Sequence, residues 1–144
     1  MLEYQKILNQ NMLNVLKDIL VKIRDEGLET SNQLYITFET DHEGVKIPNW
    51  LKDKYQNEMT IVIQYEYYDI KIHKKHFFIT LSFNDIKTQL KIDYNSIISF
   101  ADPSENFGLI LKKNIINKKN KKIIKRKNTK EKDNIINFSS YKKN

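Results

Sequence analysis

The sequence predicts an α+β, mainly β fold: an N-terminal helix, then a small SH3-like open β-barrel built from two sheets, then a disordered C-terminal tail. Three observations predict it. Apolar residues recur every three or four positions near the N-terminus, and from Leu34 they alternate every second position. After Leu111 this patterning stops and lysine dominates. We therefore expect one folded domain over residues 1–111, with its barrel over 33–111.

The first element is a helix over residues 3–25. Its apolar residues recur at helical spacing, and Gly27 suits a C-terminal stop. Such a helix is about 34 Å long, and its apolar surface is wider than a small sheet needs to cover. One interpretation is packing on its own domain. The other adds a dimer interface with a second copy, formed by Leu8, Met12, Leu16 and Ile19.

The period then changes from helix to strand. Leu34, Ile36 and Phe38 alternate with polar or aromatic neighbours, which predicts a strand. A loop over residues 41–46 follows, and Pro48 suits the start of a short helical turn over 49–54. The next apolar stretch, residues 59–65, is a predicted strand that 67–73 either continues or restarts.

The second half of the domain is predicted to be hairpins and short strands. Two alternating stretches flank Asn84-Asp85, a short polar pair typical of a hairpin turn. A last core strand or short helical turn is expected before the break at Asp102-Pro103. Five or six strands in about 80 residues favour a small open barrel or a two-sheet sandwich. The expected segments here are 75–83, 86–92, 97–100 and 107–111.

Charge is divided unevenly along the chain. Residues 1–111 hold 12 Lys and Arg against 16 Asp and Glu, whereas residues 112–144 hold 13 against 2. The basic balance of the protein therefore belongs to its tail, and the folded domain is not predicted to be a basic nucleic-acid binder. Residues 112–134 have no aromatic residue and no apolar period, so we expect a disordered, lysine-rich linker.

The last ten residues, 135–144, differ in kind from the linker. Apolar and aromatic side chains occur again there, at Ile135, Ile136, Phe138 and Tyr141. One interpretation is a short linear docking motif. The other is chance, because the whole sequence is rich in Ile, Asn and Lys.

Several function classes find no support in the composition. There is no cysteine, hence no disulfide framework and no thiol nucleophile. No apolar stretch approaches the roughly 20 residues that a membrane helix needs. The N-terminus lacks the cationic and apolar regions of a signal peptide. We therefore expect a cytoplasmic protein that does not bind membranes.

Catalytic, metal and cofactor chemistry is also not predicted. His73 and His76 flank an expected turn and His42 lies in a distant loop, which is a poor arrangement for a metal site. Asp41, His42 and Glu43 are consecutive in a loop and point in different directions. With three glycines in the chain, no glycine-rich phosphate loop is possible. We expect a protein that is not an enzyme and has no metal and no cofactor.

An aromatic cluster offers the main functional alternatives. It can be core and cross-strand packing, or the wall of an apolar groove that accepts an extended peptide at a strand edge. A third interpretation is base stacking, as in small barrels that bind single-stranded nucleic acid. The acidic domain argues against that one, while the lysine-rich tail keeps an RNA-binding protein as the alternative function. The cluster comprises Tyr65, Tyr67, Tyr68, Phe77, Phe78 and Phe83.

Four segments in this order carry a family resemblance. They are YITFETDHEGVKIPNWLKDKY at residues 35–55, EMTIVIQ at 58–64, FFITLSF at 77–83 and FADPSENFGL at 100–109. Together they resemble the alphaproteobacterial branch of the SspB family and cover nearly the whole predicted domain. The resemblance implies a helix through which two copies dimerise, followed by a small barrel. It also implies an adaptor that binds the ssrA degradation tag in a groove between its sheets and delivers tagged polypeptides to the ClpXP protease.

The resemblance also assigns residues. The segment at 135–143 is similar to the module with which the family docks on the N-terminal domain of ClpX. The expected docking residues are Ile135, Ile136, Phe138, Tyr141, Lys142 and Lys143. The expected peptide-binding residues are Val45, Lys46, Ile47, Pro48, Ile63, Gln64, Tyr65 and Phe83. The sequence departs from the family at one turn. The resemblance implies a glycine-rich turn after Phe83, whereas this chain has Asn84-Asp85 there.

Overall fold

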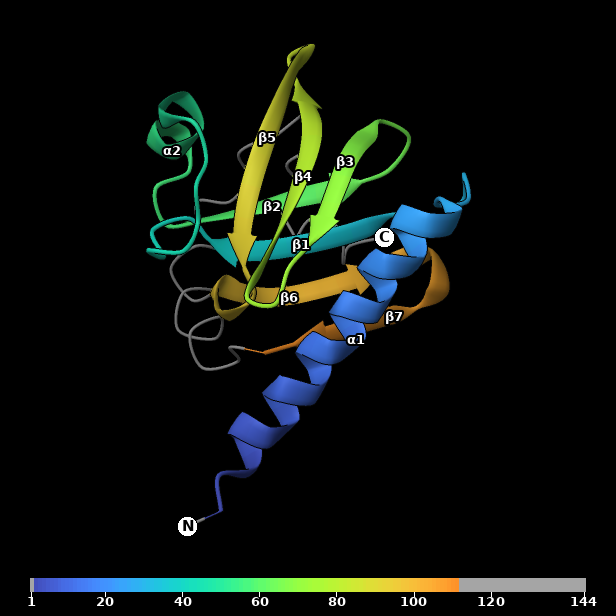
Figure 1. The fold of residues 1–144 in the computed structure, drawn as a ribbon, viewed down its shortest axis with the longest axis vertical. Helices are drawn as coiled ribbons and strands as arrows, with labels where there is room; N and C mark the ends of the chain where they lie inside the picture. Colours follow the sequence, from blue (N-terminus) through green and yellow to red (C-terminus); the bar gives the residue numbers. More distant parts are fainter. Residues whose placement is uncertain (1, 112–144) are drawn as a thin grey trace, which may run out of the picture.

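A computed structural model describes residues 2–111 of the chain (Figure 1). The expected linker at 112–134 and the docking segment at 135–144 lie outside the described residues. The helices are α1 (Tyr4–Glu26) and α2 (Asn49–Lys54). The strands are β1 (Leu34–Glu39), β2 (Glu58–Ile63), β3 (Tyr67–Ile72), β4 (His76–Phe83), β5 (Ile86–Asp93), β6 (Ile97–Asp102) and β7 (Phe107–Ile110).

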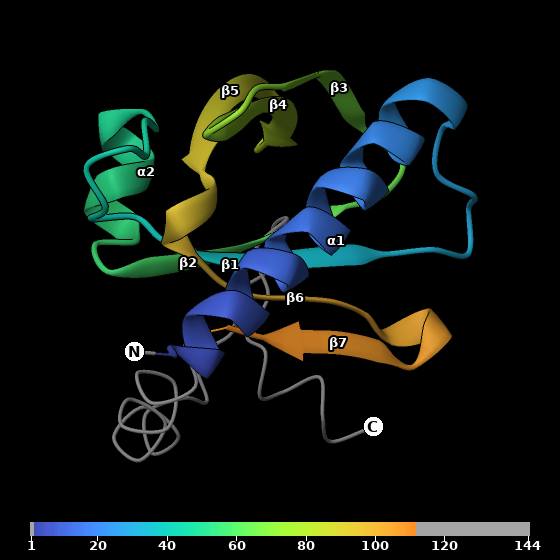
Figure 2. The same cartoon turned by 60° about the horizontal axis from the view of Figure 1, so that its bottom comes forward.

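The strands form two antiparallel sheets. One has the order β2-β1-β6-β7 and the other the order β3-β4-β5. Figure 2 shows the smaller sheet above the larger one, with α1 crossing one open side and α2 closing the other. The predicted fold class, a helix followed by a small barrel-like β domain, is confirmed. The described residues contain seven strands rather than five or six.

Helix α1 ends as predicted. Gly27 has φ 84°, a positive value that glycine adopts without strain, and its N–H donates to the Ile23 carbonyl at 2.9 Å. One face of the helix packs into the core, with Leu16 and Leu20 fully buried. Closer to the N-terminus, Tyr4, Ile7 and Leu8 stay exposed. The helix is therefore anchored by its C-terminal two thirds.

The chain changes sheets between β2 and β3. Tyr65, in the connection, has φ 59°, and the Glu66 N–H donates to the Gln64 carbonyl at 2.6 Å. This tight turn ends β2 and starts β3 in the other sheet. The stretch 67–73 therefore restarts as a separate strand rather than continuing the one before it.

The β4–β5 hairpin has an unbroken register from His76↔Asp93 to Phe83↔Ile86. Its two turn residues, Asn84 and Asp85, have φ 53° and 65°. Both values suit the two-residue turns that match the twist of a hairpin, and Asn and Asp tolerate them better than most residues. The predicted hairpin is confirmed, and it is made without glycine.

The segment expected at 97–100 as a core strand or a short helical turn is a strand. Residues 97–102 form β6, which lies between β1 and β7. Pro103–Glu105 is a 3₁₀ turn in which the Asp102 carboxylate accepts the Ser104 N–H at 3.0 Å. Asn106, with φ 55°, then reverses the chain into β7. The core fills the space between the sheets, and its largest fully buried side chains include Phe38, Phe77, Phe83 and Phe100.

Candidate functional site

The segment before α2, residues 45–48, is held against the smaller sheet. Lys46 forms an antiparallel bridge with Lys91 of β5, in which the Lys46 N–H donates to the Lys91 carbonyl at 2.9 Å and the reverse bond is 3.0 Å. The Val45 side chain is buried in the core, Ile47 and Pro48 are partly exposed, and Lys46 is exposed. The backbone of this segment is thus fixed while its lysine faces solvent.

Helix α2 follows directly and contacts the end of β4. Pro48 is extended, with φ −61° and ψ 152°, and its carbonyl accepts the N–H groups of Leu51 and Lys52 at 3.0 Å each. The Trp50 and Phe83 rings form a T-shaped pair, with ring centroids 6.4 Å apart and an interplanar angle of 76°. Phe83 is buried, whereas Trp50 is 43% exposed. This contact joins α2 to the tip of the β4–β5 hairpin.

The third part of the expected site is the end of β2. Ile63 is fully buried, Gln64 is partly exposed and Tyr65 is 71% exposed. Ile63 shares the core cluster with Val45 and Phe83. The structure therefore places all three side chains in the core of the domain, and it leaves Lys46 and Tyr65 on the surface.

Two strand edges adjoin these residues. β2 and β5 are each the outermost strand of their sheet. Within residues 2–111, the outer side of β5 is bridged at Lys91 by Lys46. Such edges present backbone donors and acceptors that an added extended peptide can pair with. The arrangement is suited to peptide binding at the end of the domain where α2 meets the hairpin.

The aromatic cluster predicted from the sequence divides by burial. Phe77 and Phe83 are core residues, as the packing interpretation expects. The Tyr67 hydroxyl lies near α1 and accepts the Leu28 N–H at 2.8 Å. Tyr68 carries the Lys87 ammonium 4.2 Å from its ring centroid. The cluster therefore does not form one continuous aromatic platform.

Two residues beside the expected site were not predicted from the sequence. Trp50 contacts Phe83, and Ile86 is 56% exposed at the tip of the hairpin, opposite Phe83 in the register. Trp50 is the single tryptophan of the chain, and an exposed tryptophan on a short helix is a signal for a contact surface. Ile86 follows the turn directly and stays exposed, although its cross-strand neighbour Phe83 is buried.

The histidines serve loops and turns. The His42 Nδ1 accepts the Gly44 N–H at 2.9 Å. His73 and His76 lie at the β3–β4 turn with ring centroids 4.9 Å apart. Partial burial, then the nearby Lys91 and His73, lower the pKa of His76 below its usual 6.5, while Asp93 opposes the shift. In the part of the chain that the structure describes, no group of three His, Cys, Asp or Glu residues is placed to hold a metal ion.

The residues expected at a dimer interface lie along one side of α1, at helical spacing, and differ in burial. Met12 and Leu16 are buried in the domain's own core, and Ile19 is partly buried beside it. Leu8 is 53% exposed. Among the described helices, none is long and apolar enough to cross a membrane.

The helix, the two sheets and the strand edges define a small helix-plus-barrel domain with a surface suited to extended peptides. A family model described as SspB, stringent starvation protein B, matches residues 6–143. The chain belongs to this family, and the resemblance predicted from the sequence is confirmed. The family is one of adaptors and not a known enzyme family. A search of curated proteins finds no match to the sequence.

Proposed function

We propose that this protein is an adaptor that binds the ssrA degradation tag of substrates and tethers them to the ClpX unfoldase, which enhances proteolysis by ClpXP. The observation that supports this most is the position of residues 45–48. Their backbone is bonded to the outer edge of β5, in a chain that belongs to the SspB family. The proposed site of action is the cytoplasm.

Peptide capture uses the end of the domain where α2 meets the hairpin. The tag lies extended between the 45–48 segment and the hairpin, above a floor made by Val45, Ile63 and Phe83. Because these three side chains are buried in the core, they shape the floor rather than reach out to the peptide. The exposed ammonium of Lys46 pairs with a carboxylate of the tag, and the Gln64 amide and the Tyr65 ring contact it from the side of β2.

The tail then tethers the captured substrate. As a flexible chain, residues 112–134 span about 26 Å root-mean-square, which holds the substrate near ClpX at an effective concentration in the millimolar range. The segment at 135–143 docks on the N-terminal domain of ClpX. Weak binding of the tag by the unfoldase then becomes efficient capture without chemistry by the adaptor.

Dimerisation through α1 supplies two tails to one unfoldase. Leu8 is the exposed member of the four expected residues, Ile19 is partly buried, and Met12 and Leu16 support the contact from inside the core. The exposed Tyr4 and Ile7 extend the apolar surface around Leu8. The alternative function, RNA binding, finds less support, because acidic residues outnumber basic ones in the folded domain.

The test is degradation of an ssrA-tagged substrate by ClpXP with the full chain or a chain lacking residues 135–144. We expect the truncated protein to bind the tag with unchanged affinity and to lose its stimulation of degradation. As a matched control, Asn137→Ala with Ser139→Ala changes two polar positions of the same segment and should retain most of the stimulation. Full stimulation by the truncated protein would show that this segment is not the docking module.

A further inference from the structure

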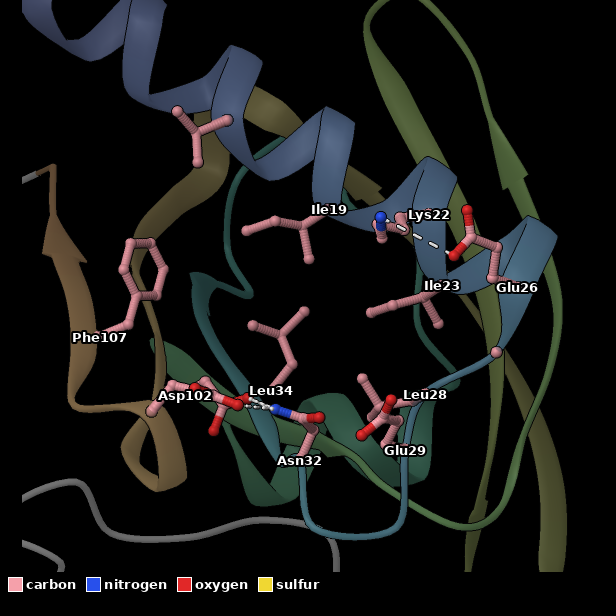
Figure 3. Close-up of a pocket in the computed structure, with 13 residues that line it drawn as sticks. Ile19, Lys22, Ile23, Glu26, Leu28, Glu29, Asn32, Leu34, Asp102 and Phe107 are labelled. Atoms are coloured by element: carbon pink, nitrogen blue, oxygen red, sulfur yellow. Dashed lines mark hydrogen bonds and ion pairs between the residues drawn. The ribbon is translucent and has the colours of Figure 1, made fainter.

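A hollow of about 570 Å³ lies under the C-terminal half of α1, at the edge of the larger sheet (Figure 3). Its walls come from α1, the loop before β1, and the β6–β7 connection. Six apolar side chains form its floor and sides: Val15, Ile19, Ile23, Leu28, Leu34 and Phe107. None of the eight residues expected to bind the tag lines it. This surface is therefore separate from the proposed tag site.

The lining of this hollow is strongly acidic. Four carboxylates line it, from Glu26, Glu29, Asp102 and Glu105, against the one ammonium of Lys22. Lys22 lies 3.8 Å from Glu26. The Asn32 side chain donates to Asp102 at 2.7 Å and to Glu105 at 3.1 Å, so the loop before β1 fixes two of the carboxylates (Figure 3). An occupant with apolar side chains between basic ones fits this lining.

We propose that the hollow is the docking site of this chain's own segment Lys121–Arg126, with the sequence KKIIKR. This segment places two adjacent isoleucines between pairs of basic residues. The isoleucines complement the apolar floor and the four cations complement the carboxylates. The lysine-rich tail, predicted from sequence only as a linker, thereby has a partner surface on its own domain.

The length of chain between Leu111 and Lys121 is sufficient for this segment to reach the hollow. The described chain ends at Leu111, four residues beyond Phe107 in the lining. From Leu111 the chain has to run back about 13 Å, the length of four strand residues, to reach Phe107 again. Treated as a flexible chain, the 11 residues from 112 to 122 span about 18 Å root-mean-square. The segment therefore reaches the hollow without being stretched.

Other apolar pairs in the tail fit less well. Ile115-Ile116 begins four residues after Leu111, too short a connection to turn back and reach beyond Phe107, and it is flanked by asparagines. Ile135-Ile136 is preceded by Asp133 and Asn134 rather than by basic residues. The N-terminal end of α1 in a second copy is apolar but carries both Glu3 and Lys6 there, so it lacks the charge complementarity of KKIIKR.

The proposed docking has a low intrinsic affinity, but the segment stays near its site because both belong to the same chain. Solvent-exposed ion pairs each add little. However, a tethered segment meets its site at an effective concentration of about 1 mM, so an intrinsic Kd of about 1 mM leaves it docked in roughly half of the molecules. Docking requires no second chain, and it is expected to weaken as salt screens the charges.

The experiment is paramagnetic relaxation enhancement on the full-length protein. The chain has no cysteine, so Asn120→Cys gives a single site for a nitroxide label beside the segment. We expect the label to broaden amide signals at Ile19–Leu34 and Asp102–Phe107 well beyond those at Lys46 and Phe83. Salt at 0.5 M should reduce this difference about threefold or more, as expected for screened surface charges.

Matched variants separate the proposed contact from general attraction to the tail. Ile123→Asp with Ile124→Asp should abolish the selective broadening, whereas Ile115→Asp with Ile116→Asp should leave it in place. Glu29→Lys with Glu105→Lys should reduce it about threefold or more. Asp53→Lys with Glu66→Lys reverses two exposed charges outside the hollow and should have little effect.

Two results would overturn the proposal. One is broadening that is uniform over the domain or unchanged by the Ile123 and Ile124 substitutions. The other is broadening seen only between chains, when spin-labelled protein is mixed with isotope-labelled protein, since the hollow would then serve a second copy. Neither readout involves the tag or ClpX, so failure here is distinct from failure of the proposed adaptor function.

Discussion

Lys46 and Lys91 exchange two backbone hydrogen bonds, of 2.9 and 3.0 Å, between the segment before α2 and the outer edge of β5. The two residues are 45 positions apart in the sequence. Because the bonds are between backbones, the pairing fixes the course of residues 45–48 and leaves the Lys46 side chain outside. The proposed tag site therefore has one preformed wall, and the predictions below address what holds it there.

Gly44 lies against Asp93, just before this wall. A Cβ at residue 44 would lie 2.8 Å from both Cβ and Cγ of Asp93. Asp93 is held in place, because its carboxylate accepts the Asn95 N–H at 2.8 Å and its carbonyl accepts the Ser96 hydroxyl at 2.7 Å. We expect Gly44→Ala to lower the free energy of unfolding by about 1–3 kcal/mol and to weaken tag binding, measured by urea denaturation and peptide titration.

Gly108→Ala is the matched control for this substitution. A Cβ there would meet the Ala101 Cβ at 3.4 Å, close to an ordinary contact, so we expect a change within about 0.5 kcal/mol. Equal stability of both variants would show that the contact between Gly44 and Asp93 does not position the segment.

Trp50 joins α2 to the hairpin through its edge contact with Phe83. Aromatic pairs of this geometry contribute about 0.5–1.5 kcal/mol beyond their buried area. We expect Trp50→Ala to weaken tag binding by about threefold to tenfold, measured by fluorescence anisotropy of a labelled peptide. Trp50→Phe keeps an aromatic edge and should retain most of the affinity. Unchanged binding by the alanine variant would place the tag elsewhere.

Two tyrosine hydroxyls differ in what they bond. The Tyr67 hydroxyl accepts the Leu28 N–H, so Tyr67→Phe removes an acceptor and should cost about 0.5–1.5 kcal/mol of unfolding free energy. The Tyr94 hydroxyl is buried with no hydrogen-bond partner in the described structure, and burial raises its pKa to about 12. Tyr94→Phe should therefore leave the free energy of unfolding unchanged or raise it. Urea or thermal unfolding of both variants measures the two effects. The opposite ranking would contradict these assignments.

Acidification should destabilise the domain through His76. Because its pKa is lowered in the folded state, the unfolded chain takes up the proton first as the pH falls below 6.5. The free energy of unfolding then falls with pH through this window. We expect His76→Gln to lessen the loss of stability between pH 7.5 and 5.5, measured by urea denaturation.

Lys91 provides a second check on the same histidine. Its charge is one cause of the lowered pKa, so Lys91→Gln should raise the pKa of His76 towards 6.5, as followed by NMR titration. Lys87→Gln, on the same strand but nearer the hairpin turn, should leave the pKa of His76 unchanged. A pKa of His76 that rises equally in both variants would argue against the specific effect of Lys91.

Much of the fold was predictable because its elements have strong local signals. The helix was expected over 3–25 and spans Tyr4–Glu26, and the short helix at 49–54 and the hairpin at Asn84-Asp85 were also found as expected. The division of the strands into two sheets was not predictable in detail. It depends on the turn at Tyr65, a residue type that gives no sequence signal for a positive φ.

The candidate site was predictable as segments but not as surfaces. Val45, Ile63 and Phe83 are apolar in the sequence, but only the packing of both sheets shows that all three belong to one core. The acidic hollow could not be predicted, because it joins residues such as Asn32 and Asp102 that are 70 positions apart and that meet through a single side-chain bond.

The most direct test of the adaptor function is the anisotropy of a fluorescent ssrA-tag peptide titrated with the full-length protein. A peptide of the same composition in scrambled order is the control. We predict saturable binding of the tag peptide, with the scrambled peptide bound at least tenfold more weakly, which corresponds to about 1.4 kcal/mol of sequence-dependent binding. Equal binding of both peptides, or binding of neither by the folded protein, would contradict the proposal that this domain recognises the ssrA tag.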